Sequence, residues 1–317
     1  MNKTETAVTA AAQQILSQIR RVVVGKDGTL LWTLAAILAR GHILLEDIPG
    51  VGKTTMALSF SKTLNLKYAR VQFTPDVLPS DVTGFSILDQ ATGKMIYQPG
   101  AVLCNLFLAD ELNRATSRTQ SALLEAMEEG QVTVDGVSHP IPKPFIVIAT
   151  QNPTGAAGTQ LLPDSQMDRF ALRMSLGYPD AAAEKNMILN RLKKNPMAEL
   201  SALMSAEDLA AMQQCVAETH INDQVVEYIV NLIGATRSNP HVHRGASPRA
   251  TLCVTAMSKA IARLCGRDYV IPRDVREVFL RCIPHRLLLT SQAESAGITT
   301  QKVLSDIPSA VKAPQVI

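Results

Sequence analysis

The chain has 317 residues, 46% of them hydrophobic and 19% charged, which is enough for one large domain and a smaller one. A formal net charge of +3 and an aromatic content of 4% do not indicate a nucleic-acid-binding protein. Because the five cysteines lack Cys-x-x-Cys spacing, no apolar run could span a bilayer and the N-terminus shows no signal-peptide pattern, we expect a cytoplasmic protein.

The first half of the chain alternates helical segments with short apolar runs, the pattern of a parallel sheet covered by helices. Ile15, Ile19 and Val22 fit one face of a helix, and residues 30–38 predict a second, buried helix. A further helix is expected over residues 53–64. The expected strands cover residues 42–45, 70–73, 103–109, 145–149 and 170–176, the last of them covered on one face only.

Two hairpins are predicted within this region, one over residues 85–97 and one over residues 131–141, where Asp135-Gly136 is a strong two-residue turn signal. After Tyr178-Pro179 the pattern becomes almost entirely helical. One helix is well marked, with Ser247 as its N-cap and Pro248 at its first position. We therefore divide the chain into an α/β core, residues 1–177, and a helical lid with a C-terminal tail, residues 178–317.

A glycine-rich turn lies between the strand at 42–45 and the helix that follows. It consists of Pro49, Gly50, Val51, Gly52, Lys53, Thr54 and Thr55. Glycines let backbone N–H groups approach a phosphate chain, Lys53 can reach the terminal phosphates, and the Thr54 hydroxyl can hold Mg²⁺. The strict phosphate-loop pattern has glycine where this chain has Asp47. The strand before the turn and the helix after it favour a phosphate loop over an ordinary turn with a solvated lysine.

Two acids follow the apolar strand that ends at Ala109. At the carboxyl edge of a parallel sheet they would lie beside the phosphate loop. We expect Asp110 to bind Mg²⁺, directly or through water, and Glu111 to act as general base on the attacking water. A strand followed by Asp-Glu usually continues into a solvated loop, so this prediction depends on the phosphate loop that precedes it.

Three further polar residues complete the predicted site. Asn152 follows a buried strand and could orient water or touch a γ-phosphate, although a turn-forming Asn before Pro153 fits equally well. Arg169 precedes the last strand, and Arg249 lies in the first turn of the helix after Ser247. A cation there opposes the helix dipole unless an anion is near, and a nucleotide phosphate would supply one.

Together these motifs resemble the AAA+ superfamily and, within it, the MoxR family. The resemblance covers nearly the whole chain and is carried by residues 46–54, 110–115, 120–129, 149–153, 168–170 and 245–250. It implies a P-loop core with strand order 5-1-4-3-2 and two hairpin insertions, followed by a small all-α lid folded over the nucleotide. An Asp at position 47 is also usual in that family.

The resemblance also implies roles for residues. Asn152 would be sensor 1, Arg249 sensor 2, and Arg169 the arginine finger that reaches a neighbouring subunit's γ-phosphate. Val23, Val24 and Gly25 would lie near the adenine. An arginine that acts on a neighbour requires an oligomer, most often a hexameric ring. MoxR-like proteins are thought to remodel or mature protein clients, often with a partner bearing a von Willebrand factor A domain.

We therefore expect an ATP-dependent, Mg²⁺-dependent remodelling chaperone whose client the sequence does not identify. One alternative is a nucleic-acid-associated or chelatase-type motor, because such motors share the two hairpins. The hairpin at 131–141 has only His139 as a possible cation, which is a poor surface for phosphates. The other alternative is a scaffold that hydrolyses ATP slowly, against which the complete set of predicted catalytic residues argues.

Overall fold

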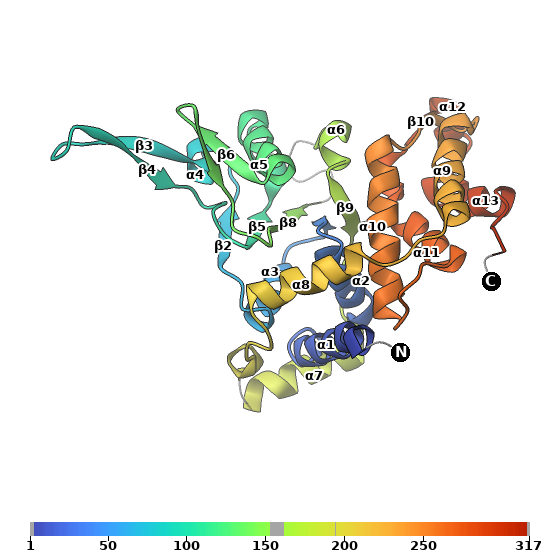
Figure 1. Cartoon of the computed structure of the whole chain (residues 1–317), viewed down its shortest axis with the longest axis horizontal. Helices are drawn as coiled ribbons and strands as arrows, with labels where there is room; N and C mark the ends of the chain where they lie inside the picture. Colours follow the sequence, from blue (N-terminus) through green and yellow to red (C-terminus); the bar gives the residue numbers. More distant parts are fainter. Residues whose placement is uncertain (1–2, 153–161, 194, 316–317) are drawn as a thin grey trace.

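A parallel five-stranded sheet forms the centre of the protein, whose structure is a computed structural model describing residues 3–152, 162–193 and 195–315 (Figure 1). The strand order is β2-β5-β8-β1-β9, and every neighbouring pair is parallel. Counted along the chain, this is the predicted order 5-1-4-3-2. The strands are β1 (His42–Glu46), β2 (Tyr68–Gln72), β5 (Leu106–Asp110), β8 (Ile146–Gln151) and β9 (Phe170–Met174).

Alternating side chains of these strands enter two separate hydrophobic clusters, one on each face of the sheet. In β5, for example, Leu106 and Leu108 belong to one cluster, whereas Phe107 and Ala109 belong to the other. The first cluster includes residues of α1 (Lys3–Arg20), α2 (Asp27–Leu38) and α3 (Lys53–Thr63). The second includes residues of α4 (Pro79–Thr83), α5 (Ser117–Glu129) and α6 (Asp164–Met167). The core is thus a three-layer arrangement, which holds the carboxyl ends of five strands at one edge.

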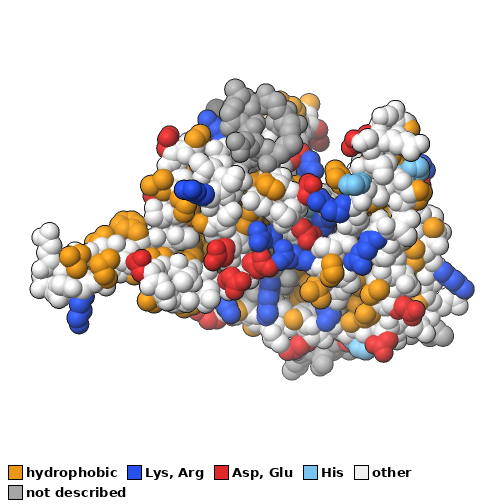
Figure 2. All heavy atoms as spheres, turned by 90° about the horizontal axis from the view of Figure 1, so that it is seen from above, with side chains coloured by type: hydrophobic (Ala, Val, Ile, Leu, Met, Phe, Trp, Pro, Cys, Tyr) orange, Lys and Arg blue, Asp and Glu red, His pale blue; other side chains and the backbone are white. Residues whose placement is uncertain are grey.

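Both predicted hairpins are present. The first joins β3 (Gly84–Asp89) to β4 (Lys94–Pro99), and the second joins β6 (Gln131–Val134) to β7 (Val137–Pro140). Asp135 and Gly136 both have positive φ, as a two-residue turn of this kind requires. The first hairpin projects from the body of the molecule and carries exposed apolar side chains, visible in orange at its tip in Figure 2. They include Phe85, Ile87, Leu88, Met95 and Ile96.

The second half of the chain is helical, as predicted, apart from one short two-stranded pairing. Its helices are α7 (Ala181–Lys193), α8 (Ala206–Ala217), α9 (Asp223–Ser238), α10 (Pro248–Leu264), α11 (Pro272–Cys282), α12 (Ser291–Ser295) and α13 (Thr300–Ala310). The short strands are β10 (Val242–Arg244) and β11 (Leu288–Leu289), and the 3₁₀ turns are η1 (Leu112–Arg114), η2 (Pro196–Glu199) and η3 (Pro284–Arg286). Ser247 caps α10 by accepting a hydrogen bond from the Ala250 amide, with Pro248 at the first helical position.

One expectation about the sheet was wrong. The edge strand β9 is buried on both faces from Phe170 to Leu172, rather than covered on one face only. The reason is that the lid packs on it: the Cys253 thiol of α10 donates to the Ala171 carbonyl, and His285 bonds the Phe170 carbonyl.

The lid and the core share apolar packing. One hydrophobic cluster contains core residues such as Leu34 together with lid residues such as Leu209 and Val254. The division of the chain at residue 177 therefore stays a prediction. None of the helices in the described residues has both the length and the apolar character needed to cross a membrane.

Candidate functional site

The predicted phosphate loop joins the end of β1 to the start of α3. Gly50 and Gly52 adopt φ values of 89° and 100°, a backbone conformation that residues with a side chain rarely take. Gly52 is the N-cap residue of α3, so Lys53 and Thr54 begin the helix. The loop therefore presents backbone N–H groups at a helix N-terminus, which is a favourable environment for an anion.

Lys53 is buried, and its ammonium group is held by the loop itself. It donates to the carbonyl oxygens of Asp47 at 2.6 Å and Ile48 at 3.3 Å. Burial lowers the pKa of Lys53, and the nearby carboxylates oppose this shift. A phosphate would offer this buried cation a charged partner in place of two carbonyls.

Asp110 ends β5 and is bound on both oxygens. Thr150 Oγ1 of β8 donates to its Oδ1 at 2.6 Å, and Arg70 Nη2 of β2 forms an ion pair with its Oδ2 at 2.7 Å. Because β5 lies between β2 and β8, both partners come from neighbouring strands. Arg70 was not predicted from the sequence, and the signal that could have found it is its place on the strand next to β5.

Glu111 has a positive φ of 57°, an unfavourable backbone conformation for this residue that costs on the order of 1–3 kcal/mol. Its amide donates to Thr150 Oγ1 at 2.9 Å, which helps to hold it there. Its carboxylate accepts from Arg114 Nη1 at 2.8 Å and from Asn152 Nδ2 at 3.3 Å. The hydrogen bond from Arg114, opposed by partial burial and supported by Asn152, lowers the pKa of Glu111. The carboxylate is thus ionised and lies next to the amide side chain predicted to work with it.

Two clefts share residues of the phosphate loop in their linings. The smaller, of about 340 Å³, is lined by the loop with Lys53, Thr54, Asp110, Glu111 and Asn152. The larger, of about 560 Å³, is lined by Val51, Val23, Val24, Tyr178 and Pro179 among others. Pro49, Gly50, Gly52 and Thr55 line both. Gly25 does not line either cleft; it borders an adjacent groove beside Lys26 and Ser175.

Arg169 and Arg249 do not join this set. Both line a third cavity, of about 290 Å³, together with His42 and Glu128. Arg169 precedes β9 and His42 begins β1, whereas Asp110 ends β5 and Asn152 follows β8. Since all five strands are parallel, the two arginines lie at the opposite edge of the sheet from the phosphate loop.

The expected anion beside Arg249 is a carboxylate in this structure: Arg249 donates to Oε1 of Glu128. Arg169 Nε donates to Oε2 of the same carboxylate at 3.0 Å. The role of a nucleotide phosphate at Arg249 stays a prediction. The residues of the predicted lid that border the larger cleft come instead from its beginning, and they are Tyr178, Pro179, Glu184, Met187, Asn195, Pro196 and Met197. Glu128 belongs to the motif at 120–129, which was noted in the sequence without a role.

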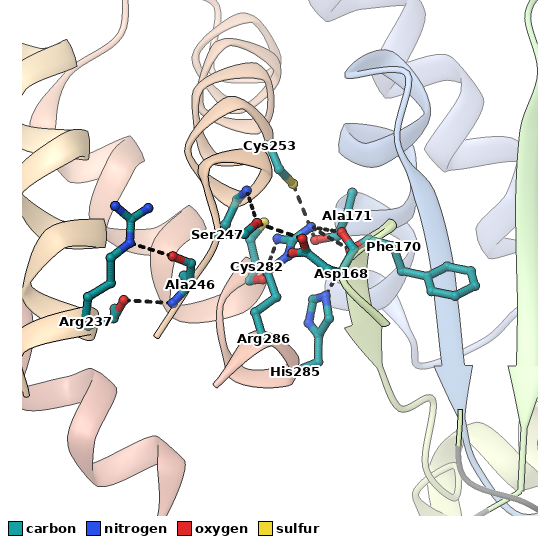
Figure 3. A network of polar contacts seen from close by, with 12 residues as sticks. Asp168, Phe170, Ala171, Arg237, Ala246, Ser247, Cys253, Cys282, His285 and Arg286 are labelled. Carbon is teal, nitrogen blue, oxygen red and sulfur yellow. Dashed lines mark hydrogen bonds and ion pairs between the residues drawn. The ribbon is translucent and has the colours of Figure 1, made fainter. Parts of the chain in front are cut away.

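A buried network fixes the lid behind the arginines (Figure 3). Arg286 of η3 forms an ion pair with Asp168 at 2.9 Å and donates to the Phe170 carbonyl at 2.8 Å. Ser247 Oγ, at the start of α10, donates to the other Asp168 oxygen at 2.7 Å. The Arg286 side chain is 2% exposed, so this pair is strongly desolvated and its geometry is specific. Arg169 and the first turn of α10 are therefore held together.

Comparisons with known proteins agree with this arrangement. Residues 42–172 match the family described as "ATPase family associated with various cellular activities (AAA)", and residues 234–307 match the "AAA lid domain". The chain is 44% identical to Bacillus subtilis YeaC over 299 residues, covering 94% of this chain and 93% of that protein. It is 37% identical over 313 residues to "Chaperone MoxR1" of Mycobacterium tuberculosis, covering 96% of this chain and 82% of that one.

A solved structure is similar over almost the full length. The crystal structure of a proposed ATPase from Cytophaga hutchinsonii superposes with a TM-score of 0.90 at 34% sequence identity, covering 98% of this chain and 97% of that one.

Proposed function

The chain belongs to the MoxR family of AAA+ ATPases, and we propose that it binds ATP with Mg²⁺ and hydrolyses it to ADP and phosphate. One observation carries this proposal above the others. A buried lysine, two strand-end carboxylates and an amide line one cleft beside a glycine-rich helix N-terminus. That set supplies the positive charge, the base and the water-orienting group that phosphoryl transfer to water requires.

The two clefts that share the phosphate loop would accommodate the two ends of ATP. The triphosphate would lie on the loop formed by Pro49, Gly50, Val51, Gly52 and Lys53, with Thr54 and Thr55 at the helix start. The adenosine would occupy the larger, more apolar cleft beside Val23 and Val24. Gly25 would act indirectly, by shaping the turn that follows these valines.

Mg²⁺ prefers oxygen ligands, and the Thr54 hydroxyl and the Asp110 carboxylate line the same cleft. The Asp110 carboxylate already forms an ion pair with the positively charged side chain of Arg70. We assign Thr54 and Asp110 to the metal, with Arg70 as the group that neutralises Asp110 without it. When bound, Mg²⁺ would neutralise charge on the β- and γ-phosphates.

Glu111 is assigned as the general base. Its carboxylate would accept a proton from the attacking water, and Asn152, which donates to that carboxylate, would orient the water or the γ-phosphate. Arg114 competes for the same carboxylate, and its ion pair represents a resting arrangement. Lys53 would exchange its two carbonyl partners for phosphate oxygens.

Arg169 and Arg249 are assigned to the γ-phosphate of a neighbouring subunit. Their distance from the phosphate loop of their own chain supports this assignment for both, including Arg249. A site completed by a neighbour requires an oligomer, and a hexameric ring is the arrangement we propose. Such trans-acting arginines are worth about a thousandfold or more in turnover in well-studied phosphoryl-transfer systems.

We propose that the energy of ATP hydrolysis drives the remodelling or maturation of a protein client, with a von Willebrand factor A domain protein as partner. The name of the Mycobacterium relative, a chaperone, supports this role. The apolar side chains on the projecting β3–β4 hairpin offer a surface for a protein rather than for a polyanion.

The test is steady-state ATP turnover over protein concentrations that span ring assembly. Wild type should turn over ATP once rings form, Lys53→Ala should bind no nucleotide, and Glu111→Gln should bind ATP without hydrolysing it. Normal turnover by Glu111→Gln would show that the base is another residue. Wild-type rings without ATPase activity would refute the proposed function. Proteins that co-purify with Glu111→Gln in ATP, and not in ADP, would then identify the client.

A further inference from the structure

The side chain of Asp47, the residue that departs from the strict phosphate-loop pattern, is turned to the linker between β9 and the lid. Its Oδ1 accepts from Ser175 Oγ at 2.6 Å and from the Gly177 amide at 3.1 Å. Its Oδ2 accepts from the Leu176 amide at 2.6 Å. Asp47 is only 6% exposed, so three donors and a buried carboxylate satisfy one another away from water.

The backbone of Asp47 belongs to the phosphate loop. Its carbonyl accepts the 2.6 Å hydrogen bond from the Lys53 ammonium, and its amide donates to the Gln151 carbonyl at 3.3 Å. One residue therefore contacts the phosphate-binding lysine through its main chain and the linker through its side chain.

The linker continues directly into the other cleft. Tyr178 and Pro179 line the larger cleft opposite Val23 and Val24, and Lys26 Nζ donates to the Tyr178 carbonyl at 2.7 Å. The segment 175–178 is thus fastened to the phosphate loop at one end and to the turn after α1 at the other. Moving the linker relative to the loop would change the distance between the two clefts.

We propose that Asp47 is a positioning residue that fixes the phosphate loop relative to the larger cleft, so that the triphosphate and the adenosine of one ATP molecule can bind at the same time. This inference rests on the proposed function and deepens it. Asp47 has no positive φ, unlike Gly50 and Gly52, so the backbone at this position does not require glycine. The side chain at this position instead serves the three hydrogen-bond donors at residues 175–177.

The decisive variant is Asp47→Gly, which restores the strict phosphate-loop pattern. If the pattern alone determined binding, this change would be neutral or favourable. Loss of the carboxylate instead leaves three donors at 175–177 without their partner, a change large enough to alter affinity about tenfold or more. The matched control is Glu46→Gln, since the neighbouring carboxylate pairs with the part-exposed Arg173, accepts from Gln151 Nε2 and lines neither cleft.

The measurement compares the affinities of ATP and of inorganic tripolyphosphate, which needs only the phosphate loop. We expect Asp47→Gly to weaken ATP binding about tenfold or more and tripolyphosphate binding less than about threefold, while Glu46→Gln stays within about threefold for both. Asp47→Asn keeps one acceptor oxygen and should give an intermediate ratio.

Equal losses for ATP and tripolyphosphate would show a merely structural role and overturn the proposal, as would ATP binding by Asp47→Gly at the wild-type level. Thermal unfolding of each variant reports the folded fraction, and Asp47→Asn carries the comparison if the glycine variant does not fold. Wild-type protein that binds tripolyphosphate but not ATP would instead refute the proposed function itself.

Discussion

Arg169 and Arg249, separated by eighty residues and belonging to the core and the lid, are bound to the same carboxylate, that of Glu128. Glu128 lies in the last turn of the helix α5, which begins shortly after the strand β5. The pair lies at the edge of the sheet opposite the phosphate loop of its own chain. In the ring that we propose, that edge would be available to complete a neighbour's site.

A mixing experiment tests whether the arginines act on a neighbour. We expect the double variant Arg169→Ala/Arg249→Ala to lose about a hundredfold or more of its turnover. Adding Lys53→Ala protein, which supplies intact arginines but no nucleotide site, should restore part of the activity. Each protein alone is the control. Mixtures that stay as inactive as the separate proteins, although they assemble, would place the arginines in their own chain's site.

Glu128 is predicted to position both arginines without contributing much to stability. Its partners are part-exposed, and such ion pairs are worth about 1 kcal/mol or less. Glu128→Gln should therefore lower kcat about tenfold or more, since the guanidinium groups lose a common orientation. ATP affinity and the thermal midpoint should change little.

The matched control for that change is Glu129→Gln, which removes the adjacent, exposed carboxylate. If Glu128→Gln and Glu129→Gln lowered kcat equally, the loss would come from the charge of the helix end rather than from the contact with the arginines.

Arg114 is predicted to set the acid limb of the pH–rate profile. Its hydrogen bond is the main cause of the lowered pKa of Glu111. A general base must be deprotonated, so activity falls as the pH drops through that pKa. In Arg114→Ala the pKa should return toward its ordinary range, and the acid limb of kcat/KM, which reports the free enzyme, should move to higher pH. The measured quantity is the pH at the midpoint of the acid limb, which does not depend on the maximal rate. An unchanged midpoint would show that Arg114 does not set the pKa of the general base.

Much of the catalytic edge could be predicted from the sequence because its signals are local. The phosphate loop, Asp110-Glu111 and Asn152 each follow an apolar strand directly, and parallel strands bring such ends together. The unbroken apolar run of β5 is typical of a strand covered on both faces, and its residues indeed enter the two clusters in turn.

Contacts between distant segments were not predictable in the same way. Arg70 and Glu128 are ordinary charged residues in the sequence, and their roles arise only from strand order and from the docking of α10. That docking depends on the buried pair of Asp168 and Arg286, which lie 118 positions apart and have no local pattern in common. For the same reason, the sequence indicated an anion beside Arg249 but not which one.

The joint between lid and core should also make the protein sensitive to acid. His285 is buried at this joint, donates from Nε2 to the Phe170 carbonyl, and has no partner for Nδ1 within the described residues. Burial, with the nearby Arg286, lowers the pKa of His285 to about 3.

Because the ordinary pKa is about 6.5, the unfolded chain binds a proton at this position between about pH 6.5 and 3 that the folded chain does not. The free energy of unfolding should then fall as the pH drops through this window, by up to about 1.4 kcal/mol per pH unit from this one group. His285→Gln keeps a donor for the Phe170 carbonyl and removes the titration. Urea unfolding at several pH values should show a shallower slope for the variant below pH 6.5, with a constant offset from wild type above pH 7.5. Equal slopes would mean that the buried imidazole becomes protonated in the folded protein as readily as in the unfolded one.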